Sequence, residues 1–100
     1  MCQPRRHFMP LIALPLLLWA VSNHGAEPEG LLKQGGCMNC HDISRPKVGP
    51  PFQMVAARYR DNENGAHTRF TSALRDGVGH PKTTLNEDEI AAVTQWILKR

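Results

Sequence analysis

The chain has 100 residues, with 12 Lys or Arg against 9 Asp or Glu and a formal net charge of +3 at pH 7. This length excludes a two-domain enzyme and allows at most one small domain. We expect the segment that contains Arg5 and Arg6 to be removed, which leaves nearly balanced charge from Glu27 onward and predicts no nucleic-acid partner. A core of this size supplies only a few kcal/mol of net stability, so such a domain usually needs a disulfide, a metal or a cofactor.

Residues 1–26 have the three-part pattern of a secretory signal peptide. Two arginines precede an apolar run from Phe8 to Val21, and small and polar residues follow up to Ala26. The run is much shorter than the roughly 20 apolar residues of a membrane-crossing helix. We therefore predict cleavage after Ala26 and a periplasmic protein that is not an integral membrane protein once the leader is removed. Cleavage after Ser22 and retention of the leader as an anchor are the alternatives.

Residues 27–100 show no β-type alternation, internal repeat or low-complexity tract, which predicts an all-α domain. The helical segments are 28–34, 52–59, 66–75 and one that opens at Asn86, with loops at 42–51 and 76–84. Pro28 suits a first helical turn, and Gly35-Gly36 ends that helix because glycine readily takes the left-handed conformation. The run 61–65 separates the second and third helices.

Each of the last three helices has an apolar face that we expect to be buried. The expected core positions are Val55, Ala56 and Tyr59, then Phe70, Ala73 and Leu74, then Ile90, Val93 and Ile97 with Trp96 beside them. Asn86 and Glu89 have the spacing of a capping box, so the last helix begins sharply.

The run from Cys37 to His41 is C-x-x-C-H, the attachment signature of a c-type haem. Two thiols three positions apart on a helical turn can form thioethers to two vinyl groups, while the adjacent imidazole lies under the iron. We therefore predict one covalent haem c, held by Cys37, Cys40 and His41. This cofactor also provides the extra stability that a small core lacks.

Three other interpretations of Cys37 and Cys40 are possible. A thioredoxin-like dithiol needs a βαβ setting, which the pattern does not contain. A zinc site needs a second pair of ligands. A disulfide between the two cysteines closes a loop too short to stabilise the chain much.

From the motif onward the chain resembles the small monohaem class I cytochromes c of bacteria. The matching segments are 27–32, 48–52, 55–59 and 96–98 around the C-x-x-C-H run, so the resemblance covers residues 27–100. It implies three to four helices wrapped around one covalent haem, with the first and last helices crossing beside it. It also implies that the Pro50 carbonyl accepts the Nδ1 proton of His41, which fixes the imidazole.

The second axial ligand departs from that family. Family members use a methionine in the loop before the last helix, usually followed by proline, but residues 77–85 contain no methionine. His80-Pro81 falls at that place when positions are counted back from the capping box, and its flanking glycines allow the backbone to pass close to a porphyrin. We predict that His41 and His80 are the two metal ligands.

The remaining candidates for that position are weaker. Met38 lies inside the motif, on the same side of the haem as His41. Met54 is more simply explained as a flexible side chain in the core or on the surface. His67 is more simply explained as a solvated histidine on the surface.

Imidazole is a stronger donor than a thioether and favours Fe(III), so a bis-histidine haem has a low potential. We predict a periplasmic electron-transfer protein that passes single electrons between redox partner proteins and has no small-molecule substrate. The sequence contains no visible nucleophile, general base or second metal constellation, so we do not expect an enzyme. The alternatives are a haem-based sensor with a labile sixth ligand and a haem subunit of a larger oxidoreductase.

Cationic side chains are candidates for two further roles. A basic rim that steers acidic partners would consist of Arg45, Lys47, Arg58 and Lys82, although scattered surface charges are the alternative. Arg69 or Arg75 is a candidate partner for a haem propionate.

Overall fold

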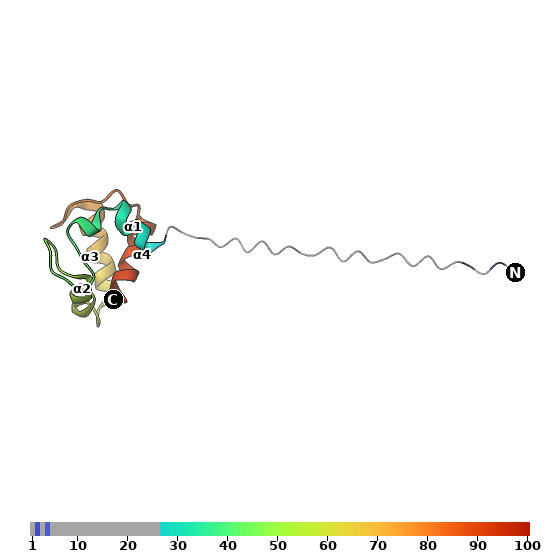
Figure 1. The fold of residues 1–100 in the computed structure, drawn as a ribbon, viewed down its shortest axis with the longest axis horizontal. Coiled ribbons are helices and arrows are strands. Elements are labelled where there is room, and N and C mark those ends of the chain that lie inside the picture. The colour runs from blue at the N-terminus through green and yellow to red at the C-terminus, as the bar shows by residue number, and fades with distance from the viewer. Residues whose placement is uncertain (1, 3, 5–26) are drawn as a thin grey trace.

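The computed structural model describes residues 2, 4 and 27–100. The predicted leader, with its apolar run and its possible cleavage sites, lies outside the described residues. The described part forms α1 (Pro28–Gln34), the short 3-10 turn η1 (Cys37–Asn39), α2 (Phe52–Arg58), α3 (Glu63–Asp76) and α4 (Glu87–Leu98), with no strand among these residues (Figure 1). The all-α prediction is confirmed. None of the helices in residues 27–100 is long and apolar enough to cross a membrane.

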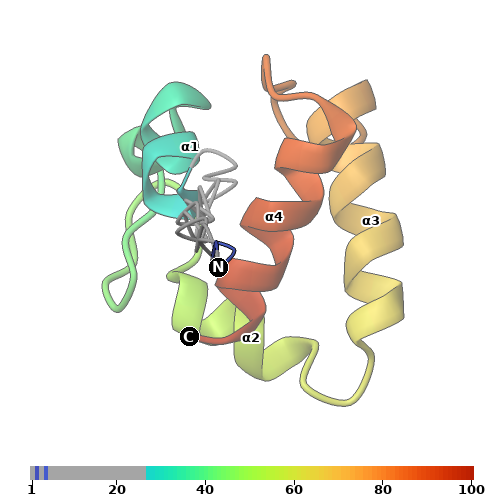
Figure 2. The same cartoon turned by 90° about the vertical axis from the view of Figure 1, so that its right-hand side faces the viewer.

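Helix α4 is the element that the other three helices contact, so it organises the domain (Figure 2). The predicted capping box is present: Glu89 N donates to Asn86 Oδ1 at 2.9 Å, and Asn86 N donates to Glu89 Oε1 at 3.0 Å. These two bonds satisfy helix N–H groups that otherwise have no partner. The expected packing of the first helix on the last is also observed.

The core is small and lies between α1, α2 and α4. Its buried members are Leu31, Leu32, Phe52, Leu85, Ile90, Val93 and Ile97. Ile90 and Val93 are fully enclosed, as predicted from their shared helix face. The buried Thr94 hydroxyl donates to the Ile90 carbonyl at 2.8 Å, so its polar group is satisfied within the helix.

Helix α3 begins three residues earlier than its sequence pattern predicts. Asn62 Oδ1 accepts from Gly65 N at 3.0 Å, which makes Asn62 the N-cap and lets the helix run through residues that we expected to be a break. A Cβ at residue 65 would lie 2.7 Å from Asn62 Oδ1, so glycine leaves room for this cap. The helix ends at Gly77, whose φ of 74° is left-handed.

Arg75 joins the end of α3 to the start of α4. Its Nη2 lies 2.9 Å from Asp76 Oδ2, and its Nη1 donates to Glu87 Oε1. The side-chain hydrogen bond from Arg75 lowers the pKa of Asp76. Arg75 therefore has a role in helix packing, and the prediction that it serves a haem propionate has no support in this geometry.

Candidate haem-binding site

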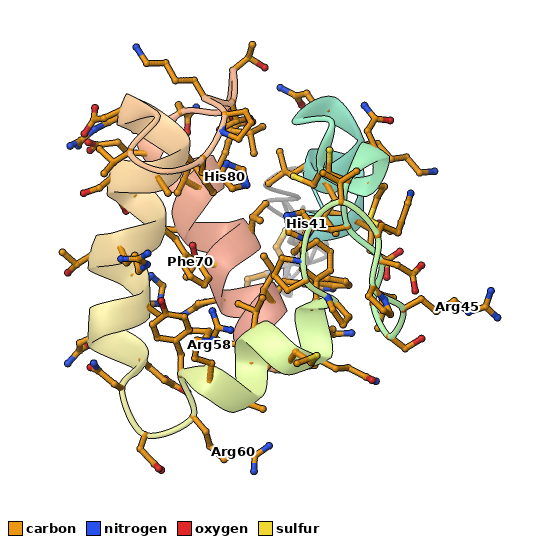
Figure 3. All side chains as sticks on the ribbon, turned by 90° about the vertical axis from the view of Figure 1, so that its left-hand side faces the viewer. His41, Arg45, Arg58, Arg60, Phe70 and His80 are labelled. Carbon is orange, nitrogen blue, oxygen red and sulfur yellow. The ribbon has the colours of Figure 1, made fainter. Side chains whose placement is uncertain are left out.

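A cavity of about 430 Å³ opens between the helices, and it is lined mainly by apolar side chains. Its walls include side chains from α2, α3 and α4, the C-x-x-C-H turn and the loop after α3 (Figure 3). Phe70, Ala73 and Leu74 line this cavity and are only half-buried, whereas Ala66 on the same helix is fully enclosed. We expected these three side chains to be buried, and they are only half-buried because their apolar face lines the cavity.

The two motif cysteines lie on one tight turn at the edge of the cavity. Gly36, with a left-handed φ of 71°, precedes the turn, and Cys40 N and His41 N both donate to the Cys37 carbonyl, at 3.2 and 3.0 Å. Both thiols are free and both line the cavity. Burial raises the pKa of the Cys37 thiol. The turn therefore presents two thiols and one imidazole to the same space.

The His41 imidazole is fixed by the backbone of the following loop. Its Nδ1 lies 2.7 Å from the Pro50 carbonyl oxygen. A carbonyl only accepts, so Nδ1 carries the proton and Nε2 of the neutral ring keeps its lone pair. Gly49 N donates to the Cys40 carbonyl at 2.7 Å, which holds the loop against the motif.

Gly49 is in direct contact with the His41 ring. A Cβ at this residue would lie 2.7 Å from Nδ1 and 2.8 Å from Nε2 of that ring. We expect Gly49→Ala to destabilise the haem-loaded protein by about 1–3 kcal/mol, because the ring or the loop must move. Denaturant unfolding measures this change.

Gly30→Ala is the matched control, because nothing lies within 4 Å of a Cβ there. It lies within α1, where alanine is favoured over glycine by up to about 1 kcal/mol. Equal stability changes for the two variants would contradict the close approach of Gly49 to His41.

The loop that delivers Pro50 is shaped by Asp42. Its Oδ2 accepts from Ser44 N at 3.1 Å and from Arg45 N at 2.9 Å, and these bonds lower its pKa from the ordinary 3.8. Lys47 Nζ donates to the Met38 carbonyl at 2.8 Å, so this cation bridges the loop and the motif. Lys47, which we predicted to belong to a basic rim, is thus held by a hydrogen bond within the domain.

Because the folded pKa of Asp42 is depressed, its contribution to stability is present above pH 3.8 and is lost as the pH falls through the folded value. We expect the Asp42→Asn variant to lose less stability than the wild type between neutral pH and acid. The amide oxygen of asparagine still accepts the two backbone bonds but does not titrate. Unfolding curves at several pH values test this prediction. An identical loss of stability at acid pH in the wild type and in Asp42→Asn would contradict it.

His80 projects from the loop between α3 and α4. Gly79 has a left-handed φ of 67°, and Thr83 N donates to the Leu74 carbonyl at 2.9 Å, which ties the far end of the loop to α3. The Nδ1 of His80 lies 2.7 Å from the Pro81 carbonyl oxygen. As in His41, a carbonyl partner places the proton on Nδ1 and leaves the Nε2 lone pair free.

The fold brings His41 and His80 together across the cavity. Their ring centroids are 6.1 Å apart and their planes differ by 9° (Figure 3). Two imidazoles that bind one metal ion from opposite sides at about 2 Å have centroids roughly 6 Å apart. The spacing of the rings, the free Nε2 atoms, the adjacent thiols and the apolar cavity all fit a covalently attached haem.

The other sequence candidates lie elsewhere. Met54 is 59 % exposed on α2, His67 is half-buried on α3, and neither lines the cavity.

Arg58 and Arg69 line the cavity, so they are better placed than Arg75 to pair with carboxylates of a bound cofactor. Sequence reasoning placed Arg58 in a basic rim and did not predict that it lines the cavity. It also missed the contact of Phe52 with His41. The only signals were the helical spacing of Arg58 from Val55 and the position of Phe52 shortly after Pro50.

The chain is similar to several known c-type cytochromes. No family model matches the chain. It is 34% identical over 76 residues to cytochrome c-552 of Hydrogenobacter thermophilus, covering 70% of this chain and 78% of that protein. It is 32% identical over 76 residues to cytochrome c-551 of Azotobacter vinelandii, covering 70% and 93%. Cytochrome c-551 of Pseudomonas aeruginosa is 28% identical over 81 residues, covering 74% and 77%.

The all-helical fold and the C-x-x-C-H turn on an apolar cavity are consistent with these relatives. The chain belongs to the class I monohaem c-type cytochromes, the family of the cytochromes c-551 and c-552, which carry one covalently attached haem c.

Proposed function

We propose that this protein is a periplasmic carrier of single electrons between redox proteins, with a low-potential haem. Cys37 and Cys40 hold the haem as thioethers, and His41 and His80 bind its iron from the two faces. The observation that carries the proposal is the 6.1 Å separation of the two imidazoles across the cavity. Residues 1–26 act as the export signal in this proposal, because their pattern is that of a secretory leader.

The bound haem supplies a one-electron Fe(III)/Fe(II) couple. His41 and His80 tune it, because each donates a lone pair from an imidazole whose Nδ1 proton is held by a carbonyl. Such hydrogen bonds raise the basicity of the ring and stabilise Fe(III), which lowers the potential. With protein side chains on both faces, no position is left for a substrate, and this supports a carrier rather than an enzyme.

The cations on the cavity wall have a binding role in this proposal. Arg58 and Arg69 line the cavity from α2 and α3, and guanidinium groups pair with carboxylates through two parallel hydrogen bonds. We assign them to the haem propionates. This pairing neutralises two negative charges that the apolar cavity does not solvate.

The axial pair is tested by the ferric near-infrared spectrum of the haem-loaded wild type and of His80→Ala. We expect a low-spin bis-imidazole band in the wild type and its loss in His80→Ala. His67→Ala is the control, because His67 lies outside the cavity, and its spectrum should match the wild type. An unchanged bis-imidazole band in His80→Ala would show that His80 is not the second iron ligand.

Carbon monoxide separates the carrier from a gas sensor. With His80 bound, the spectrum of the reduced wild type should not change on mixing with a low concentration of the gas. Rapid binding would favour a sensor with a labile sixth ligand. Co-purification of a second chain at fixed stoichiometry would instead favour a subunit of a larger oxidoreductase.

A further inference from the structure

The imidazole planes of His41 and His80 are nearly parallel, with 9° between them. Their mutual orientation is a separate property from their identity as ligands, because each ring can turn about its bond to a metal. The terminal torsion of a histidine side chain is broad and sets no plane by itself. A defined plane therefore requires contacts from the surrounding protein.

For His41 that contact is Phe52. The two rings are stacked, with centroids 5.1 Å apart and 21° between their planes. Phe52 is itself immobilised: it is 3% exposed and meets Trp96 edge-on, with centroids 5.8 Å apart and an angle of 89°. Trp96 of α4 therefore fixes Phe52 of α2, and Phe52 in turn fixes the plane of the His41 ring.

The hydrogen bond to Pro50 restrains one edge of the His41 ring, and Phe52 restrains its plane. On the other side, His80 precedes a proline, which restricts its backbone to extended conformations. Its Nδ1 is bonded to the Pro81 carbonyl within the same short segment. Both rings are therefore held from the protein side.

We propose that Phe52 is a positioning residue that holds the His41 imidazole parallel to that of His80. This proposal rests on the axial pair proposed above. Two parallel imidazoles donate to the same one of a pair of iron d orbitals and so separate the energies of the two orbitals strongly. This separation produces a rhombic low-spin ferric EPR signal with three resolved features. Perpendicular rings donate to both orbitals equally and produce one strongly anisotropic low-field feature.

The experiment records ferric EPR spectra of the haem-loaded wild type, Phe52→Leu, Phe52→Met and Met54→Leu. We expect one sharp rhombic signal in the wild type and in Met54→Leu. Met54 lies on α2 with Phe52 but is 59% exposed and does not line the cavity, so its variant controls for a substitution on the same helix. In the two Phe52 variants we expect loss of the single signal to a broadened or second component, with the bis-imidazole near-infrared band retained.

The outcomes separate this proposal from the proposed function. A strongly anisotropic wild-type signal together with a bis-imidazole near-infrared band would overturn the parallel arrangement and leave the axial pair intact. Absence of that band in the wild type overturns both. Phe52 variants with the wild-type EPR signal show that Phe52 positions nothing. If Phe52→Leu does not load haem, Phe52→Met decides the role, because the flexible, unbranched methionine side chain adapts to the space that the ring leaves.

Discussion

Replacing His80 with methionine is expected to raise the reduction potential by on the order of 200 mV, equal to roughly 5 kcal/mol for a one-electron couple. A thioether is a softer and weaker donor than imidazole, so the variant stabilises Fe(II) relative to the wild type. The Gly77–Gly79 backbone and the Thr83–Leu74 bond keep the loop at the cavity, so the new side chain starts from the same place. Spectroelectrochemical titration of both haem-loaded proteins measures the change.

His67→Met is the matched control, because the same substitution is made at a histidine outside the cavity. We expect its potential to equal that of the wild type. If His80→Met leaves both the potential and the ferric spectrum unchanged, His80 is not an iron ligand and the low-potential proposal fails with it.

Replacing both motif cysteines with serine is expected to remove most of the helical structure of the protein when it is purified free of haem. The folded chain has an open, mainly apolar cavity of about 430 Å³. Without haem the apolar walls of this cavity are exposed to water, and the stabilisation from their burial, about 25 cal/mol per Å² of apolar surface, is lost. A single core in a domain this small supplies only about 3–5 kcal/mol. Far-UV circular dichroism and a thermal scan measure the loss.

Cys2→Ser is the control for the double variant, because Cys2 lies in the predicted leader and not at the cavity. We expect it to retain the covalent pigment and the wild-type melting curve. A haem-free Cys37→Ser/Cys40→Ser protein with wild-type helix content and cooperative unfolding would show that the fold does not depend on its cofactor.

Several features of this protein depend on residues that lie close together in the sequence. The C-x-x-C-H run predicts haem attachment because both thiols and the imidazole share one turn. The bounds of α1 and the capping box of α4 follow from residues within one helical turn, and both are observed as predicted. Local patterns succeed here because the contacts they describe are local.

The start of α3 shows the limit of that reasoning. Asn62, Asn64 and Gly65 are typical of a turn, yet Asn62 caps a helix that continues through the other two. The capping bond and the packing of α3 on α4 outweigh the weak propensities of single residues. Likewise, the half-burial of Phe70 depends on a cavity to which all parts of the domain contribute.

By itself the sequence determined the cofactor chemistry, the all-α class and His80 as the candidate opposite His41. Only the tertiary structure decided that these two imidazoles lie 6.1 Å apart in nearly parallel planes, with Phe52 packed against one of them. It also decided that Arg75 joins two helices while Arg58 and Arg69 line the cavity. The reason is physical: these relations join residues far apart in the chain, and their distances are set by how the helices pack rather than by any pattern along one of them.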